Sequence, residues 1–479
     1  MEKHRLSKST FIRSTQCLKS LYLHKRRPFL RDRLSAEQLA KFKRGTDVGI
    51  LAQQLFPGGV NLQPKSPAQY RKAIADTLTH ISTNNDFTIY EASFQSDQIL
   101  IILDILMQKD GKVYAYEVKS SKAISETYLK DAAIQYQVIQ NSGIPIEDFF
   151  IVYINKDYQF NDEQGQIDLN QFFKIESVLD KIKKLQKEIQ NHIPKAKETL
   201  NLKHSPEISI GPQCHAPYPC DFRRHCWKQV PNNSVFDLPF LSEEQKFDLH
   251  SKGILELTDV KSYIDLNDIN QIKLDCHLNN NIFFNKEKIR GIFDALNNPL
   301  YFINFSCVAF AVPRWANCKP FEAVPQHLTI TTVGTNQSLK ESSFLISRSE
   351  TSPKIAVSKF LNEQIKKGST VVVFNQKELI EEPDSFNLID LQDLIKGDAV
   401  YHPEITESSD LQSINIKLLK NKKNPHLLSL LRIHQKLEMY LESDKTPDGQ
   451  TIIEQIEKSE KAQNKIQYEF WKLLSSFTS

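Results

Sequence analysis

The stretch that decides the fold is ILIILDILMQKDGKVYAYEVKSS, residues Ile99 to Ser121. Two runs of β-branched and aromatic residues flank a polar turn, Lys109-Asp110-Gly111, which is the pattern of a β-hairpin. One acid, Asp104, interrupts the apolar run I-I-L-D-I-L-M, where an unpaired carboxylate is costly to bury. The stretch therefore predicts a strand pair that carries a paired or metal-bound acid.

The second strand of this hairpin adds an acid and a base. Glu117 and Lys119 are two residues apart, so they project from the same face of the strand, and Asp104 can lie beside Glu117. Two carboxylates, a lysine and the backbone carbonyl of Val118 suit one or two Mg²⁺ or Mn²⁺ ions, which prefer oxygen ligands. Such an ion activates water and offsets charge on a phosphate, so the pattern favours phosphodiester hydrolysis. The alternative is an exposed pair of Glu117 and Lys119, with Asp104 capping the strands.

Hydrophobic periodicity places this hairpin among alternating elements. Helices are expected over 36–56, 66–81 and 126–143, strands over 88–94 and 148–156, and one long charged helix over 170–197. Further strands are expected at 300–310, 327–334 and 370–375. The fold class is therefore α/β, with a mixed sheet in the first half and a second sheet after residue 299.

The order D-I-L, E-V-K and a helix with Gln135-Tyr136 resembles the PD-(D/E)XK nuclease superfamily, and within it the RecB-like branch. The resemblance implies that Asp104, Glu117 and Lys119 are catalytic. It also implies that Gln135 and Tyr136 support the site or touch DNA. The fold it implies is the mixed-sheet nuclease core of that superfamily, with Mg²⁺ or Mn²⁺ as the cofactor.

Two further positions bear on the metal ligands. Glu91, on the strand before the hairpin, is a weaker candidate ligand. RecB-like nucleases often carry a histidine about four residues after a helix glycine, but this chain reads Thr-Asp-Val-Gly49 after Gly45. The missing histidine leaves the number of metal ions open.

Four of the seven cysteines bracket the predicted nuclease core. They are Cys17 on one side and Cys214, Cys220 and Cys226 on the other. Clustered cysteines in a cytosolic protein favour a metal site over disulfides. The arrangement resembles the iron-sulfur RecB-like nucleases, such as AddB and the related CRISPR-adaptation nuclease, which implies a 4Fe-4S cluster. A four-thiolate zinc site and unrelated thiols remain alternatives, although zinc ligands usually come as close pairs.

The amino-terminal region is strongly basic. Residues 1–44 hold 13 Lys and Arg against 3 Asp and Glu, a balance of +10, so the rest of the chain carries 3 − 10 = −7. Lys25, Arg26, Arg27 and Arg31 are therefore candidates for contacts with nucleic-acid phosphates. A solvated charged face is the alternative interpretation.

The part after residue 297 resembles DnaQ-type exonucleases of ribonuclease H-like fold. That pattern places D-x-E on the first strand, where this chain has Asn304 and Ser306, so the resemblance implies a degenerate exonuclease. Asp390 could supply a third carboxylate. A shifted alignment, with Asp393 or Glu404 in the site, is the alternative.

Taken together, the sequence predicts a nuclease domain at 1–230, a helical linker at 231–297 and a degenerate ribonuclease H-like domain at 298–479. No apolar run approaches the roughly 20 residues of a membrane helix, so a cytoplasmic protein without a membrane partner is expected. The expected activity is metal-dependent cleavage of DNA ends or single strands, with partner proteins of a repair or defence complex. The rival is a nuclease fold that binds nucleic acid without cutting.

Overall fold

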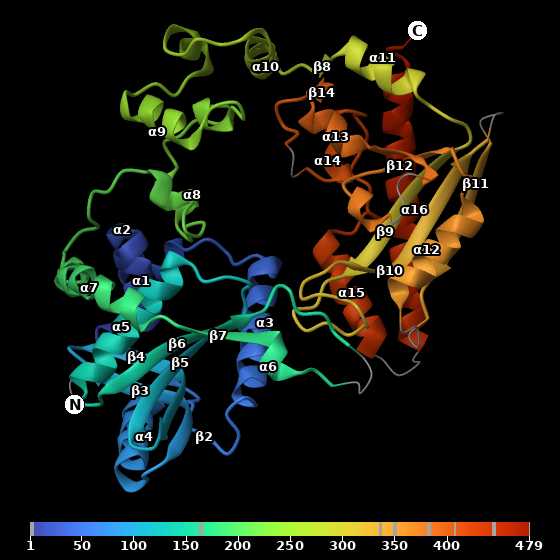
Figure 1. Ribbon diagram of the computed structural model, residues 1–479. Coiled ribbons are helices and arrows are strands. Elements are labelled where there is room, and N and C mark those ends of the chain that lie inside the picture. The colour runs from blue at the N-terminus through green and yellow to red at the C-terminus, as the bar shows by residue number, and fades with distance from the viewer. Residues whose placement is uncertain are drawn as a thin grey trace. The chain divides into compact units, whose positions relative to one another are not determined.

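The computed structural model describes residues 4–161, 166–334, 338–347, 352–380, 385–406, 409–442 and 447–478 (Figure 1). The chain divides into two compact units, Met1–Gln229 and Val230–Ser479. Each unit is of mixed α/β type and has its own sheet. Within the described ranges, no helix combines the length and apolarity needed to cross a membrane.

The first unit is built on a seven-stranded mixed sheet, ordered β2-β3-β4-β5-β6-β7, with β1 paired to β4. The strands are β1 (Leu6–Ser7), β2 (Val60–Asn61), β3 (Phe87–Ser96), β4 (Ile99–Lys109), β5 (Lys112–Lys119), β6 (Ile146–Ile154) and β7 (Phe173–Ser177). The expected antiparallel meander is formed by β3, β4 and β5, and β6 then pairs in parallel with β5. A parallel pair needs a crossover, and a helix supplies it here.

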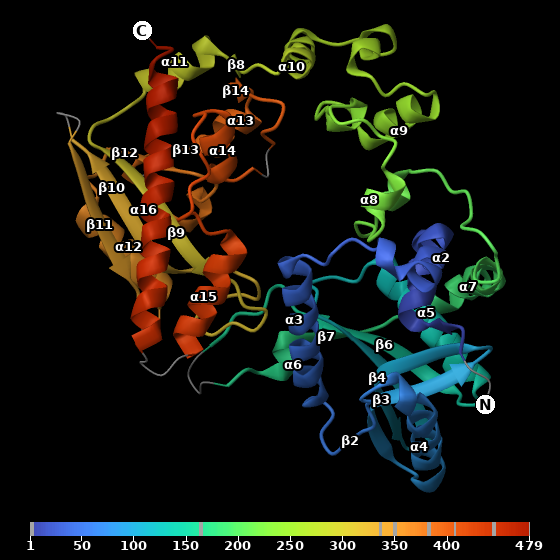
Figure 2. The ribbon, with the colours of Figure 1, turned by 180° about the vertical axis from the view of Figure 1, so that it is seen from behind.

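Helices cover this sheet (Figures 1 and 2). The helices of the first unit are α1 (Lys8–Gln16), α2 (Leu18–Arg26), α3 (Ala36–Gln53), α4 (Tyr70–Thr83), α5 (Glu126–Asn141), α6 (Leu169–Phe172), α7 (Leu179–Thr199) and α8 (Arg223–Cys226). Short 3₁₀ turns are η1 (Pro28–Leu30), η2 (Pro67–Gln69) and η3 (Pro212–Cys214). The crossover helix α5 packs on the sheet and contacts both α1 and α7.

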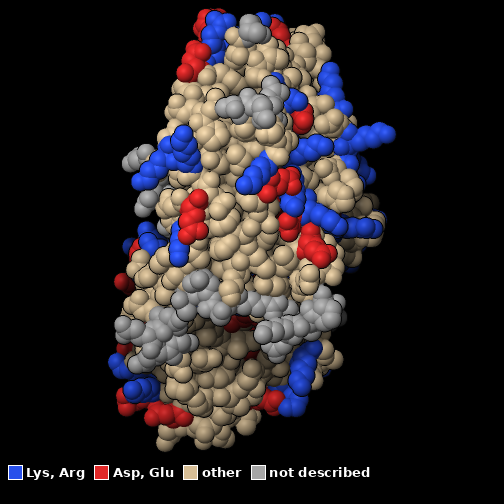
Figure 3. Space-filling view, turned by 90° about the vertical axis from the view of Figure 1, so that its right-hand side faces the viewer, with Lys and Arg blue, Asp and Glu red and all other residues tan. Residues whose placement is uncertain are grey.

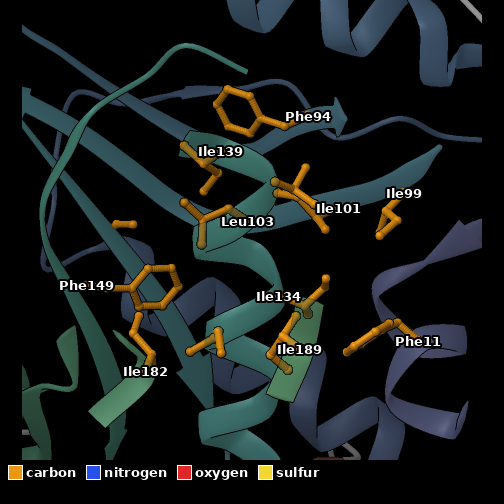
Figure 4. Packing of buried hydrophobic residues seen from close by; sticks show 14 of the residues in the cluster. Phe11, Phe94, Ile99, Ile101, Leu103, Ile134, Ile139, Phe149, Ile182 and Ile189 are labelled. Carbon is orange, nitrogen blue, oxygen red and sulfur yellow. The ribbon is translucent and has the colours of Figure 1, made fainter. Parts of the chain in front are cut away.

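The core of the first unit lies between the sheet and helices α1, α5 and α7. Figure 4 shows side chains from these elements converging, among them Leu103 of β4, Ile134 of α5 and Ile189 of α7. All three are almost fully buried. This apolar layer fixes α5 against β4 and β5, and so places any polar side chain on the same helix face.

The single helix expected over 170–197 is wrong at its start. The short helix α6 ends at Phe172, residues Phe173–Ser177 form β7, which pairs antiparallel with β6, and the long helix α7 begins only at Leu179. In FKIES a buried Phe173 is followed by the exposed Lys174 and Ile175, the pattern of an edge strand. The free edge of β6 therefore overrides the helical propensity of the charged residues.

The second unit begins with short helices and continues into a five-stranded sheet of order β11-β10-β9-β12-β13. The strands are β8 (Phe283–Phe284), β9 (Leu300–Val308), β10 (Val324–Val333), β11 (Leu339–Leu345), β12 (Thr370–Val373), β13 (Asn387–Asp390) and β14 (Val400–Tyr401). The helices are α9 (Glu243–Ser251), α10 (Asp268–Asn279), α11 (Lys286–Asp294), α12 (Pro353–Gln364), α13 (Leu391–Lys396), α14 (Leu411–Lys417), α15 (Leu430–Glu442) and α16 (Pro447–Ser475). The 3₁₀ turns are η4 (Val235–Asp237), η5 (Leu257–Ser262) and η6 (Lys377–Leu379).

The two faces of this second sheet have different partners. One apolar cluster joins the sheet to α12, and another joins it to α13, α14 and the long helix α16. Figures 1 and 2 show α16 running along the sheet. The strand β9 at the centre of the sheet therefore presents one face to α12 and the other to α16.

Candidate active site

The ladder between β4 and β5 ends where the predicted acid lies. Its last paired residues are Ile105 and Tyr116, and beyond them the strands part. The Asp104 carboxylate fills the opening, since its Oδ2 accepts a hydrogen bond of 2.6 Å from the backbone N–H of Val118. Asp104 is half-buried. The structure thus brings Asp104 to β5 beside the Glu-Val-Lys segment.

On the other side of β4, Glu91 interrupts the ladder as well. The β3–β4 pairs Tyr90–Ile105 and Ala92–Leu103 keep one register, so Glu91 and Asp104 are opposite each other, although they are not themselves a ladder pair. Glu91 has a φ of 60°, a left-handed conformation that costs a non-glycine residue about 1–3 kcal/mol. Burial raises the pKa of Glu91, Lys8 lowers it and Glu117 raises it, which places its carboxyl in the same electrostatic neighbourhood.

Glu117 occupies the centre of the site. It follows Val113 and Ala115 on the core-facing side of β5, and it is only 2% exposed. Its Oε1 accepts hydrogen bonds from Lys8 Nζ at 2.8 Å and Lys119 Nζ at 2.6 Å. Both oxygens of this buried carboxylate are engaged, because Gln135 Nε2 donates to Oε2 at 2.9 Å.

Helix α5 supplies two of the polar side chains from one face. Asp131 and Gln135 are four residues apart, so they lie one turn apart on the side that meets β5. Asp131 Oδ2 accepts from Lys119 Nζ at 2.5 Å. Gln135 is fully buried, and its Oε1 has no hydrogen-bond partner. Its neighbour Tyr136 instead packs against the hydrophobic core and is not brought into this network.

The pKa values of the two predicted metal-binding acids, Asp104 and Glu117, shift in opposite directions. Burial, together with the Glu117 charge, raises the pKa of Asp104 to about 7. Burial alone would raise the pKa of Glu117 too, but Lys119 and Lys8 hold it well below its usual range. Burial would lower the pKa values of Lys8 and Lys119, but Asp131 and Glu117 raise both above the usual lysine range. Glu117 is therefore an anion and Asp104 the group that takes up a proton.

Hard oxygen donors gather here, and their chemistry suits Mg²⁺ or Mn²⁺. The donors are the carboxylates of Asp104, Glu117 and Glu91, with the unpartnered amide oxygen of Gln135 nearby. Within the described ranges, however, no three His, Cys, Asp or Glu side chains are grouped as a metal site requires. Two lysines stand among the acids, so a metal ion would bind after some rearrangement of side chains.

Two residues of the site are not among the sequence-predicted ones. Asp131 could have been found, because it precedes Gln135 by one helical turn. Lys8 carries no local signal: it reaches Glu117 only because Leu6–Ser7 pairs with Ile99–Leu100 of β4 and Ser7 caps α1. The position of the missing histidine falls on Gly49 of α3, one turn after Gly45, and Gly45 lies near the end of β5, where an added Cβ would be 3.9 Å from Ser120 Oγ.

The four predicted cysteines line one pocket of the first unit. Cys17 sits between α1 and α2, Cys214 ends η3, and Cys226 ends α8. The backbone N–H of Cys220 donates to the carbonyl of Cys214 at 2.9 Å. All four are free thiols. The structure therefore brings together thiols that lie about 200 residues apart in the chain.

Two opposing effects act on the pKa values of these thiols: burial raises them, and nearby N–H groups and a lysine lower them. Burial raises the pKa of Cys17, whereas the backbone amides of Ser20 and Lys19 lower it. Burial also raises the pKa of Cys226, and Lys19 lowers it. Four thiols around one pocket match the donor set of a 4Fe-4S cluster or a zinc ion. As they stand, the described thiols are not close enough together to count as a metal site.

An arginine clamp fixes the cysteine loop to the amino-terminal helices. Asp221, next to Cys220, accepts from Arg13 of α1 at 2.8 Å and from Arg31 at 2.7 Å. The Arg26 guanidinium donates to the carbonyl of Leu200. Two of the four basic residues expected to contact phosphate thus make contacts inside the unit.

The other two basic candidates, Lys25 and Arg27, are exposed. The neighbouring Phe29 is 74% exposed, whereas Tyr22 is buried and donates to the carbonyl of Lys203. Figure 3 instead faces the side of Figure 1 on which β11 and α12 of the second unit lie, and there Lys, Arg, Asp and Glu are scattered among other residues.

In the second unit, the strand that should carry D-x-E meets helix α16. Asn304 and Ser306 are buried, and the Asn304 amide bonds to Gln463. Glu460, also buried, pairs with His327 of β10 at 2.7 Å. Burial raises the pKa of Glu460, and its bond to His327 lowers it. Glu460 is a carboxylate that the structure adds to this face and that the sequence pattern did not predict.

The other candidate acids of this unit have structural partners. Asp390 caps α13 and accepts from the backbone N–H groups of Asn375 and Gln392. Asp393 pairs with Lys377 at the surface, and Glu404 with Lys417. Both acids are thus engaged in ion pairs near the surface, and the shifted alignment stays an alternative.

Comparison with known proteins bears on the second unit. A search among curated proteins gives no match. A family model described as a domain of unknown function, DUF2779, matches residues 301–409, which begin in β9 and end after β14.

Proposed function

We propose that the first unit is a metal-dependent DNA nuclease of the PD-(D/E)XK type and that its four-cysteine pocket holds a 4Fe-4S cluster. The observation that carries the proposal is the meeting of Asp104, Glu117 and Lys119 where β4 and β5 part. An exposed charge pair would not need a buried glutamate whose two oxygens accept from two ammonium groups and an amide. The RecB-like resemblance supplies the reaction class.

Each residue has a definite task in this proposal. A bound Mg²⁺ or Mn²⁺ would activate water and offset charge on the phosphate. Asp104, Glu117 and the Val118 carbonyl are its ligands, with Glu91 as a further candidate. Gln135 holds the Glu117 carboxylate in place through Oε2. Asp131 holds the Lys119 ammonium, which positions that cation to meet an anionic phosphate oxygen.

For the cysteine pocket, a cluster is favoured over zinc by the ligand spacing. Cys214, Cys220 and Cys226 are separated by five residues each, with Cys17 far away, whereas structural zinc ligands usually form close pairs. The cluster would join α1 and α2 to the segment after α7. Its proposed role is a staple that closes the unit.

The cleavage test uses anaerobically purified full-length protein with labelled single- and double-stranded DNA and Mn²⁺ or Mg²⁺. Asp104→Ala and Lys119→Ala should each lower the cleavage rate by several powers of ten, because metal activation and charge neutralisation are lost together. Lys112→Ala is the matched control on the same strand, since Lys112 makes an exposed pair with Glu147. Metal-independent cleavage, or full activity in both site variants, would refute the site. DNA binding without cleavage by the wild type would favour the rival, a non-cutting nuclease fold.

The cluster has its own test. Anaerobic wild-type protein should contain about four iron atoms per chain. Cys17→Ala should lose iron and thermal stability together, whereas Cys276→Ala, outside the pocket, should keep its iron. Stoichiometric zinc without iron would show that the pocket is a zinc site.

A further inference from the structure

The carboxylate site already holds two cations of its own. Lys8 and Lys119 both donate to Oε1 of Glu117, at 2.8 and 2.6 Å. Gln135 occupies Oε2. A divalent cation that binds Glu117 at Oε1 must therefore displace an ammonium, because two cations repel each other at contact distance.

The two lysines are not equally held. Lys119 has a second strong contact, 2.5 Å to Asp131, whereas Lys8 is 4.0 Å from the same carboxylate. The Lys8 side chain is also the more exposed, at 23% against 17% for Lys119. Lys8 is therefore the ammonium that leaves at the lower cost.

The fold of α1 does not depend on the Lys8 side chain. Leu6–Ser7 pairs with β4, and Ser7 forms a capping box with Thr10. Phe11 is fully buried in the core, and Ser14 hydrogen-bonds His192. These contacts fix the helix, so the Lys8 ammonium is placed at Glu117 without being needed to place the helix.

A second observation points to a ligand at this position. Gln135 is fully buried beside Glu117, yet its Oε1 has no hydrogen-bond partner. A buried amide oxygen without a partner is unfavourable, because it has lost its hydrogen bonds to water. A hydrated metal ion at Glu117 could satisfy that oxygen through a bound water, whereas neither lysine donates to it.

We propose that Lys8 stands in for the divalent cation at Glu117 in the metal-free protein and is displaced when the metal ion binds. Lys8 is then a competing cation that sets the metal affinity of the site. Lys119 stays with Asp131 throughout. The proposal rests on the proposed metal-dependent function and adds a residue that the motif does not contain.

The test measures Mn²⁺ affinity by electron paramagnetic resonance of free Mn²⁺ in the full-length protein at fixed ionic strength. Lys8→Met and Lys8→Gln remove the competing charge and should bind Mn²⁺ at least about tenfold more tightly than the wild type. Lys8→Arg keeps a cation and should bind about as the wild type does. Lys112→Met, which removes an exposed lysine of β5, is the matched control and should change nothing.

The possible outcomes separate this inference from the proposed function. If the wild type binds Mn²⁺ and folded Lys8→Met binds it equally or more weakly, the inference is overturned but the proposed function is not. Loss of folding in both neutral variants would also overturn it, because the helix would then need the Lys8 charge. No Mn²⁺ binding by any variant would overturn the inference together with the nuclease proposal. Tighter binding by both neutral variants supports it, and a structural role for Lys8 does not predict that direction.

Discussion

Asp104 is costly to the fold and needed by the proposed chemistry. Burial and the Glu117 charge both disfavour its ionised form, so the pKa of Asp104 is raised from its ordinary value of 3.8 to about 7. Above pH 7 the folded protein must therefore carry a disfavoured anion. Functional sites commonly store this kind of destabilisation, which a ligand of opposite charge relieves.

We predict that Asp104→Asn stabilises the metal-free protein while abolishing cleavage. The amide oxygen can still accept the Val118 N–H, and no charge is buried. Because the folded-state pKa is raised, the folded state holds its proton more tightly than the unfolded chain, so wild-type stability falls as the pH rises from about 4 to 7. Every tenfold difference in proton affinity between the folded and unfolded chains corresponds to about 1.4 kcal/mol of unfolding free energy.

The measurement is the thermal midpoint of both proteins at pH 5 and pH 8 in a chelating buffer. The gain from Asp104→Asn should be larger at pH 8 than at pH 5. Asp110→Asn, in the exposed turn of the same hairpin, serves as the control. A gain that is absent or independent of pH would show that Asp104 is not strained by its charge.

Sequence periodicity could predict some residues of this site and not others. Strand alternation is enough to put Glu117 and Lys119 on one face, because the spacing of two is local. Helical spacing could have added Asp131 to Gln135. Lys8 lies more than 90 residues from Asp104, and its position follows from the pairing of a two-residue strand with β4, which has no periodicity to detect.

At the scale of elements, β7 and α16 show where propensity is overridden. The sequence of β7 resembles the start of a charged helix, but these residues pair with the edge strand β6 instead. Helix α16 is amphipathic, yet its buried face carries Glu460, Asn464 and Gln467 as well as apolar residues. Their partners are polar groups of the facing strands, His327 and Thr329 of β10 and the Ile303 carbonyl of β9, which are distant in sequence.

The arginine clamp is an element-scale feature with a testable consequence. Asp221 ties the cysteine loop to α1 through Arg13 and to the segment after η1 through Arg31. Asp221→Asn should leave two guanidinium groups close together with one neutral partner. We predict a lower thermal midpoint and faster loss of iron to a chelator than in the wild type, because the loop that carries three cysteines is loosened.

The control for the clamp is Asp248→Asn, which removes an exposed ion pair with Lys252 and should be nearly neutral. Iron release and midpoint are measured on the same anaerobic samples. If Asp221→Asn behaves like the control in both measurements, the clamp does not hold the cysteine loop.

At the scale of the whole molecule, the two units differ in the charge they can offer to metal ions. The first unit gathers four acids, Asp104, Glu117, Asp131 and Glu91, around two lysines. The second unit presents a neutral amide and a hydroxyl on its central strand. The match to a domain of unknown function lies in this second unit and therefore assigns no chemistry to the first.

The second unit is predicted to contribute no hydrolysis. Two-metal catalysis needs several carboxylates to offset two divalent ions, but the central strand offers only Asn304 and Ser306 at the expected positions. Glu460 is an acid on the helix that faces this strand, and one of its oxygens is committed to His327. Full-length protein carrying both Asp104→Ala and Glu117→Ala should therefore show no metal-dependent cleavage of DNA. Residual cleavage that disappears on adding Glu460→Gln, with the thermal midpoint kept, would instead reveal a second active site against α16.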